Sequence, residues 1–166
     1  MKKSLIITIA ICIIAFILLL VLGGFFLVKT VLNQEKDPIT VEEFKSTMQN
    51  KGYIIIDAKE QFDEYEYIKD AYIAMTDDGE YQIEFYKMSD KENATMFYKH
   101  NKSVFESSKS SSSAQTNNDM KNYSKYTLQS DNKYMVVSRI EDTVVYVKVD
   151  SKYKDQIKDL LKEIGY

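Results

Sequence analysis

Hydrophobic residues follow two different patterns along this 166-residue chain. From Ser4 to Val28 they form a run that contains no charged residue. Beyond Lys29 they recur at short intervals between polar residues, as expected for helices and strands that share one core. The pattern therefore predicts a membrane segment followed by one separately folded domain.

The run Ser4–Val28 is 25 residues long. A helix rises about 1.5 Å per residue, so a run of this length can cross a hydrocarbon core of about 30 Å. A cleaved signal peptide is the alternative, but its apolar core is usually about 7–15 residues long and ends at small residues. The best candidate end here, Leu22-Gly23-Gly24, places a bulky leucine where a small residue is needed. We therefore expect an uncleaved signal-anchor helix in contact with the lipid bilayer.

Basic residues at the two ends of this run predict its orientation. Lys2 and Lys3 precede it, and the cytoplasmic flank of a membrane helix is enriched in lysine and arginine. We therefore expect a single-pass protein of the cell membrane, with residues 1–3 inside and the domain outside. The polar residues 29–38 end at the only proline and are interpreted as a stalk, and residues 39–166 as the extracytoplasmic domain.

Local signals in the first half of the domain predict a helix and three strands. Thr40 and Glu43 have the spacing of a capping box and begin a helix over residues 41–51. The β-branched run 53–56 predicts a buried strand. Alternating runs over 71–76 and 80–88 flank Asp77-Asp78-Gly79, a strong hairpin signal. Residues 59–67 fit either a short helix or an irregular crossing.

The second half repeats this order. A second capping box at Ser89 begins a helix whose apolar side is expected to hold the following residues: Ala94, Phe97, Asn101, Val104 and Phe105. Strands are predicted over 123–128, 134–140 and 143–149, and an amphipathic helix from about residue 150 to Gly165. Ser107–Asp119 is rich in serine and lacks aromatic and branched apolar residues, so it is interpreted as a loop or a frayed helix end that buries nothing.

The predicted order is helix, three strands, helix, three strands, helix. This order indicates an α+β domain with an antiparallel sheet and about three helices packed on one face. Residues 80–97 and 143–160 share a strand–cap–helix layout, which raises the hypothesis of an internal duplication. The chain has one arginine and much lysine, isoleucine, asparagine and tyrosine, which resembles the composition of proteins from AT-rich bacterial genomes.

Charge is unevenly distributed in the domain. Residues 57–84 contain ten acidic side chains and two lysines. An acidic balance argues against nucleic acid as a partner, because nucleic-acid binding requires a basic face. The acidic segment is interpreted either as a solvated surface or as a docking face for a basic protein partner of unknown identity. The residues assigned to this possible partner-binding face are Asp57, Glu60, Asp63, Glu64 and Glu66.

No motif for catalysis, cofactor binding or metal binding is found in the sequence. His100 is the only histidine, and the only cysteine, Cys12, lies in the apolar run, so zinc ligands are missing from the domain. We therefore assign no catalytic, cofactor or metal residue. The preferred function is a non-enzymatic interaction or sensing domain, and the alternative is a cell-envelope hydrolase that uses carboxylates such as Asp57, Asp63 or Glu84.

Overall fold

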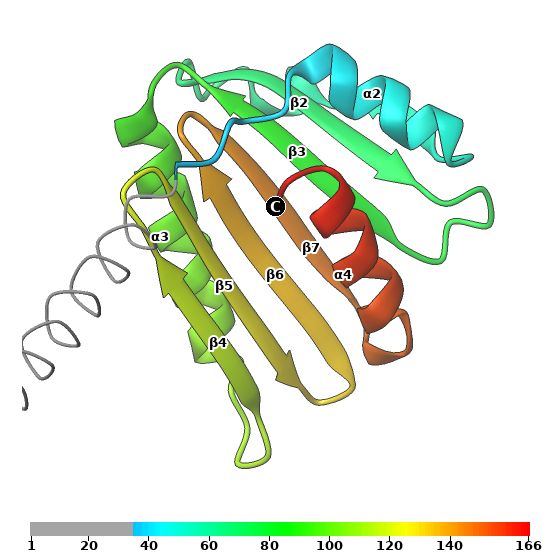
Figure 1. Ribbon diagram of the computed structural model, residues 1–166, viewed down its shortest axis with the longest axis vertical. Helices are drawn as coiled ribbons and strands as arrows, with labels where there is room; N and C mark the ends of the chain where they lie inside the picture. Colours follow the sequence, from blue (N-terminus) through cyan, green and yellow to red (C-terminus); the bar gives the residue numbers. More distant parts are fainter. Residues whose placement is uncertain (1–34) are drawn as a thin grey trace, which may run out of the picture. The chain divides into compact units, whose positions relative to one another are not determined.

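A seven-stranded antiparallel sheet forms the centre of residues 35–166, the part of the chain that the computed structural model describes (Figure 1). These residues form one compact unit. The predicted anchor Ser4–Val28 lies outside the described residues. Among residues 35–166, no helix is both long enough and apolar enough to cross a membrane.

The sheet is antiparallel throughout, with the spatial order β1-β2-β3-β7-β6-β5-β4. Along the chain, α-helices and short 3-10 helices precede, separate and follow the strands. In chain order the elements are α2 (Val41–Asn50), β1 (Ile54–Asp57), η1 (Lys59–Phe62), β2 (Ile68–Met75), β3 (Gln82–Met88), α3 (Lys91–Ser107), β4 (Ala114–Asp119), β5 (Tyr123–Ser130), β6 (Lys133–Ile140), β7 (Thr143–Asp150), η2 (Ser151–Tyr153) and α4 (Lys154–Glu163). The α+β class, the antiparallel sheet and the three helices are as predicted.

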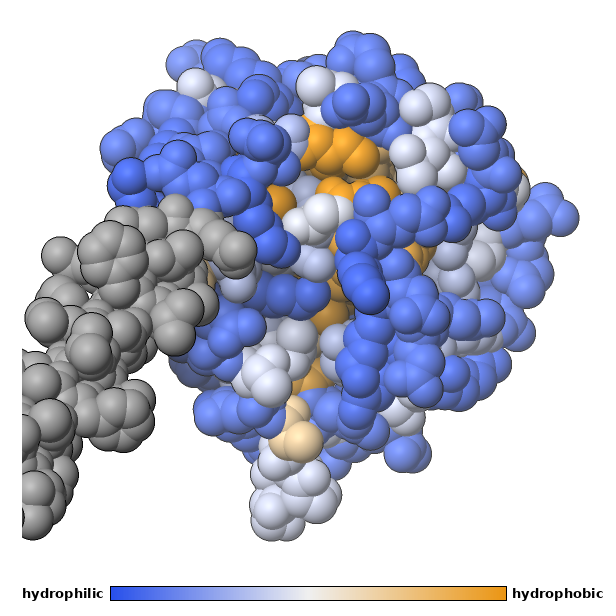
Figure 2. Space-filling model, in the orientation of Figure 1, coloured by the Kyte–Doolittle hydropathy of each residue, from blue (hydrophilic) through white to orange (hydrophobic). Residues whose placement is uncertain are grey.

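The three helices cover both faces of the sheet, so the prediction of one covered face is wrong. Helices α2 and α4 pack on one face, and α3 packs on the other (Figure 1). The reason lies in the central strands, which are apolar on both sides: Val144 and Val145 of β7 are buried in different cores. Seen from the side of α2 and α4, hydrophobic atoms are visible mainly between these helices (Figure 2).

The two strand–helix halves have similar strand order but opposite helix placement. β3 and β7 are neighbours at the centre of the sheet, and each is followed by a helix. A two-fold axis perpendicular to the sheet would keep both helices on one face. Because α3 and α4 lie on opposite faces, such a rotation does not superimpose the halves, and the fold gives the duplication hypothesis no support.

Helix α2 begins as the sequence predicts. Thr40 Oγ1 accepts a hydrogen bond from the Glu43 amide at 3.1 Å, and Glu43 Oε2 accepts from the Thr40 amide at 3.0 Å. Phe44 is fully buried and stacks on Phe85 of β3, with 4.6 Å between the ring centroids. This contact fixes α2 on the first three strands.

The face that helix α3 presents to the sheet agrees only in part with the predicted one, since Ala94 and Phe105 are buried but Phe97, Asn101 and Val104 are not. Its buried residues are Ala94, Tyr98 and Phe105, whereas Val104 remains 46% exposed. Its N-cap is Asp90 rather than Ser89, since Asp90 Oδ1 accepts from the Asn93 amide at 2.7 Å. The helix has more apolar residues than one buried face can hold, so several remain on its outer side.

Part of the predicted loop Ser107–Asp119 is the edge strand β4, which is the seventh strand that the sequence analysis missed. All six of its residues are exposed, so the expectation that this segment buries nothing holds for them. The strand is held by its backbone pairing with β5 and by side-chain hydrogen bonds, such as Tyr126 Oη to Gln115 Oε1 at 2.8 Å. Hydrophobic periodicity cannot reveal a strand of this kind.

Residues 35–40 form a strap that runs onto the domain before α2. The Lys36 amide donates to Asn122 Oδ1 at 3.1 Å, and Asn122 Nδ2 donates to the Lys36 carbonyl at 2.7 Å. Ile39 packs against the core below α2 and α4. The last part of the segment interpreted as a stalk, residues 35–38, is therefore attached to the domain.

Candidate functional site

A groove of about 570 Å³ lies between the outer side of α3 and the segment that connects β1 to β2. It is lined by residues of η1, the following turn, β2, β3 and α3. The lining residues are Phe62, Tyr65, Tyr67, Ile68, Tyr86, Asn93, Met96, Phe97, His100 and Asn101. We call it the aromatic groove, because half of these residues are aromatic.

Three of the rings form a continuous series across the groove. Phe62 of η1 meets Tyr86 of β3 edge to face at 5.4 Å between centroids, and Tyr86 meets Phe97 of α3 at 4.8 Å. Tyr65 and Tyr67 form a second edge-to-face pair at 5.7 Å. Such pairs are favourable beyond the area they bury, so the rings are held in defined positions.

Apolar surface is left exposed at this groove. Met96 is 61% exposed and Tyr65 is 45% exposed, and both line it. In the part of the chain that the structure describes, only Ile54 and Val104 are other large hydrophobic residues of comparable exposure. Val104 lies on α3 two turns after Phe97, and the polar residues His100 and Asn101 separate it from the apolar residues of the groove. Clustered apolar surface of this kind is typical of an interaction site.

The predicted acidic face belongs to the same segment. Asp57 ends β1, Glu60 lies in η1, and Asp63, Glu64 and Glu66 follow it; all five are exposed. The last three alternate along the chain with the lining residues Phe62, Tyr65 and Tyr67. Asp63 Oδ1 is 3.1 Å from Lys59 Nζ. The segment therefore places the exposed carboxylates of Asp63, Glu64 and Glu66 next in sequence to aromatic rings of the groove. Asp57 lies on the other face of the sheet, and none of the five carboxylates lines the groove.

The hydroxyl group of Tyr86 is fixed by a carboxylate at the floor of the groove. It donates to Glu84 Oε2 at 2.5 Å, and Glu84 Oε1 accepts from Gln82 Nε2 at 2.9 Å. Burial, and then the negative charge of Glu84, raise the pKa of Tyr86 well above its usual value. Tyr86 is therefore a neutral donor over the physiological pH range, and its ring stays in place.

The carboxylates proposed for the alternative hydrolase are not all close to one another in the fold. In the register of the first three strands, Asp57 is in line with Tyr72 and Phe85, whereas Glu84 is in line with Ile73. Neighbouring residues of a strand point to opposite faces of a sheet. Asp57 and Glu84 therefore lie on opposite faces and do not form a carboxylate pair.

His100 is exposed and lines the aromatic groove. The run of acidic residues is visible in the sequence, but the groove is not. Its aromatic residues come from three separate segments, around Phe62, Tyr86 and Phe97, and only the fold brings them together. The clearest signal in the sequence was the surplus of apolar residues on α3, where Met96, Phe97 and Val104 add to the buried set.

Among residues 35–166, no group of three or more histidine, cysteine, aspartate or glutamate side chains is placed to hold a metal ion. Comparisons of the chain with protein-family models, with curated proteins and with solved structures return no match.

Proposed function

We propose that residues 35–166 form a non-enzymatic binding domain, which the segment Ser4–Val28 anchors in the cell membrane with the domain outside. The domain binds a basic and partly apolar segment of a protein partner in the aromatic groove. The observation that supports this proposal most directly is the exposed apolar surface of Met96 and Tyr65 at the groove, together with the exposed Glu64 and Glu66 on either side of Tyr65 in the chain.

Each component of the groove contributes a different part of the recognition. Met96, Phe97 and Tyr65 offer apolar area, which supplies most of the affinity in protein interfaces. The aromatic faces also attract lysine and arginine side chains through cation–π contacts. The carboxylates of Asp63, Glu64 and Glu66 favour a basic partner, raise its rate of encounter and make binding sensitive to salt.

A short synthetic peptide of alternating lysine and phenylalanine tests this recognition directly. The full-length protein in a non-ionic maltoside detergent is titrated with it and followed by NMR. We expect resonances of Tyr65, Met96 and Phe97 to shift, and the affinity to fall as salt is raised. A peptide with glutamate in place of lysine should bind at least about tenfold more weakly, which corresponds to about 1.4 kcal/mol.

Two pairs of variants assign the binding to the groove. Reversing Asp63, Glu64 and Glu66 to lysine should weaken binding, whereas the same change of net charge at the exposed residues Asp37, Asp77 and Asp159 should not. Met96→Lys should weaken binding more than Val104→Lys, because only Met96 lines the groove. Equal affinity of the groove variants and their controls would show that the peptide binds elsewhere.

The predicted topology is tested separately. Protease added to intact cells or spheroplasts should digest the domain, since Lys2 and Lys3 are expected to hold the N-terminus inside. A domain that is protected until the membrane is lysed would contradict this orientation.

A further inference from the structure

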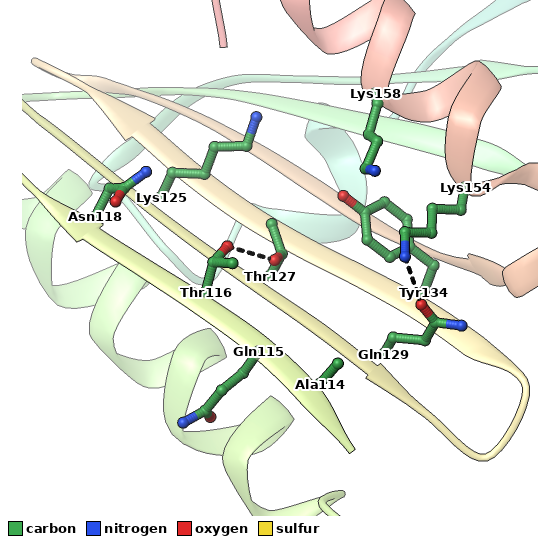
Figure 3. Close-up of a pocket in the computed structure, with 10 residues that line it drawn as sticks. All are labelled: Ala114, Gln115, Thr116, Asn118, Lys125, Thr127, Gln129, Tyr134, Lys154 and Lys158. Carbon is green, nitrogen blue, oxygen red and sulfur yellow. Dashed lines mark hydrogen bonds between the residues drawn. The ribbon is translucent and has the colours of Figure 1, made fainter. Parts of the chain in front are cut away.

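A second groove, of about 330 Å³, lies on the opposite face of the sheet from the aromatic groove. Its floor is the face of β4 and β5 that no helix covers, and its wall is α4 (Figures 1 and 3). The floor is polar, with Thr116, Asn118 and Thr127 among its side chains. Figure 3 shows Gln115 pointing away from it, to the other face, where it accepts from Tyr126 Oη.

Three lysines lie around this floor, and none of the ten lining residues is acidic. Lys154 and Lys158 come from successive turns of α4, and Lys125 from β5 (Figure 3). Residues 35–166 as a whole contain 19 basic and 25 acidic side chains, a net charge of −6. The groove is therefore a positive site on a negative domain. We call it the lysine groove.

Among residues 35–166, only Lys158 of these three lysines forms an ion pair with an acidic side chain. Lys154 Nζ donates to Gln129 Oε1 at 2.6 Å, and Lys125 Nζ donates to the main-chain oxygen of Tyr166 at 3.1 Å. Lys158 Nζ is 3.8 Å from Asp155 Oδ1, an ion pair at the solvent-exposed side of the helix. Burial, and then the charges of Lys36 and Lys158, lower the pKa of Lys125 to about 8. The three positive charges therefore lie close together, and acidic side chains nearby neutralise them only in part.

We propose that the lysine groove binds a phosphate-bearing anion. Lysine ammonium groups bind phosphate oxygens as point charges, and three of them surround a space that would hold a small phosphorylated group. The hydroxyl groups of Thr116 and Thr127, which share a hydrogen bond at 2.7 Å, and the amide of Asn118 can donate to the remaining oxygens. The phosphate belongs either to a free phosphate ester or to a lipid headgroup.

Calorimetric titration of the full-length protein in maltoside detergent with tripolyphosphate tests the site. We expect one saturable site whose affinity falls with salt. The double variant Lys154→Glu/Lys158→Glu should lower the affinity at least tenfold. Lys99→Glu/Lys148→Glu, which makes the same change of charge at exposed positions outside the groove, should change it less than twofold.

Thr127→Val keeps the shape of the floor and removes one hydroxyl group, so it tests the site without a change of charge. It should also weaken binding, and tripolyphosphate should shift the methyl resonances of Thr116 and Thr127 in the unaltered protein. Unchanged affinity in the Lys154/Lys158 variant, or equal loss in its control, would overturn the proposal.

Mixed micelles that contain phosphatidylglycerol distinguish the two sources of phosphate. Displacement of tripolyphosphate by this lipid would assign the groove to a headgroup, and no displacement would assign it to a free phosphate ester. Either result concerns only the lysine groove and is independent of peptide binding in the aromatic groove.

Discussion

The guanidinium group of Arg139 is joined to the edge strand through the hydroxyl group of Ser124. Arg139 Nη2 donates to Ser124 Oγ at 3.3 Å, and Ser124 Oγ donates to Asp119 Oδ1 at 2.5 Å. Arg139 is 4% exposed, and within the described residues its Nε has no hydrogen-bond partner. Its other hydrogen bonds within residues 35–166 go to main-chain oxygens of Asn122 and Glu141, so in this part of the chain Ser124 is its only hydrogen-bonded link to a carboxylate.

We therefore predict that Ser124→Ala destabilises the domain by about 1–3 kcal/mol, the usual effect of removing a partner from a buried charged donor. Urea unfolding followed by circular dichroism measures the loss. Ser103→Ala, at an exposed position on α3, is the matched control and should change stability by less than about 0.5 kcal/mol. Similar stability of the two variants would mean that water replaces the hydroxyl group without cost.

The strap gives a second prediction. A fragment Glu35–Tyr166 should unfold cooperatively and be more stable than Pro38–Tyr166 by about 1–2 kcal/mol, because only the longer one retains the two hydrogen bonds between Lys36 and Asn122. Asn122→Ala should reduce this difference, which makes the comparison a double-mutant cycle. Non-cooperative melting of both fragments would show that residues 1–34 are needed for the fold.

The edge strand gives a third prediction. Replacing Ala114–Asp119 with a glycine–serine segment of equal length should cost about 2–4 kcal/mol, because it removes the bonds from Gln115 to Tyr126, from Thr116 to Thr127 and from Asp119 to Ser124. Faster amide hydrogen exchange in β5 should accompany the loss. A loss below about 1 kcal/mol would mean that the segment contributes no more than a flexible loop.

Lys125 gives a prediction about pH. Its lowered pKa, about 8, means that the unfolded chain binds more protons than the folded one between about pH 8 and its ordinary value of 10.5. The cost of the buried charge is therefore complete below pH 8 and is relieved as the pH rises. The stability of Lys125→Met relative to the unaltered protein should fall by about 1 kcal/mol between pH 7 and pH 10, after a discount for solvent screening.

Unfolding of both proteins at each pH measures this difference, and titration of the tyrosines affects them equally. A difference that does not change with pH would show that Lys125 is not desolvated by the fold.

Local signals predicted most of the elements correctly because their physical causes are local. The capping residues Thr40 and Glu43, and the alternation that places Ile83 and Phe85 in one core, operate within a few residues of the chain. Packing depends on segments far apart in the chain, so local signals do not predict it. Tyr98 and Phe97 are neighbouring aromatic residues on α3, and only the position of the sheet decides that Tyr98 is buried and Phe97 lines a groove.

The candidate sites were predictable to a smaller extent for the same reason. A run of charge along the chain identified Asp63, Glu64 and Glu66, but the rings beside them come from segments far apart in the sequence. The spacing that puts Lys154 and Lys158 on one side of a helix is visible in the sequence. Lys125 joins them only through strand pairing, which the sequence does not show. The polar strand β4 left no hydrophobic signal, although it supplies part of the floor of the lysine groove.

The strap determines how the domain responds to mechanical force. A pull applied at Glu35 is borne first by its ion pair with Lys121 and by the two hydrogen bonds between Lys36 and Asn122, in the connection between β4 and β5. These bonds lie outside the strand ladder, so they can break one after the other while all seven strands stay paired. Residues 35–40 can then straighten until they span at most about 20 Å, and the load reaches α2. Tension along the chain is thus absorbed by lengthening of the strap before the sheet is loaded.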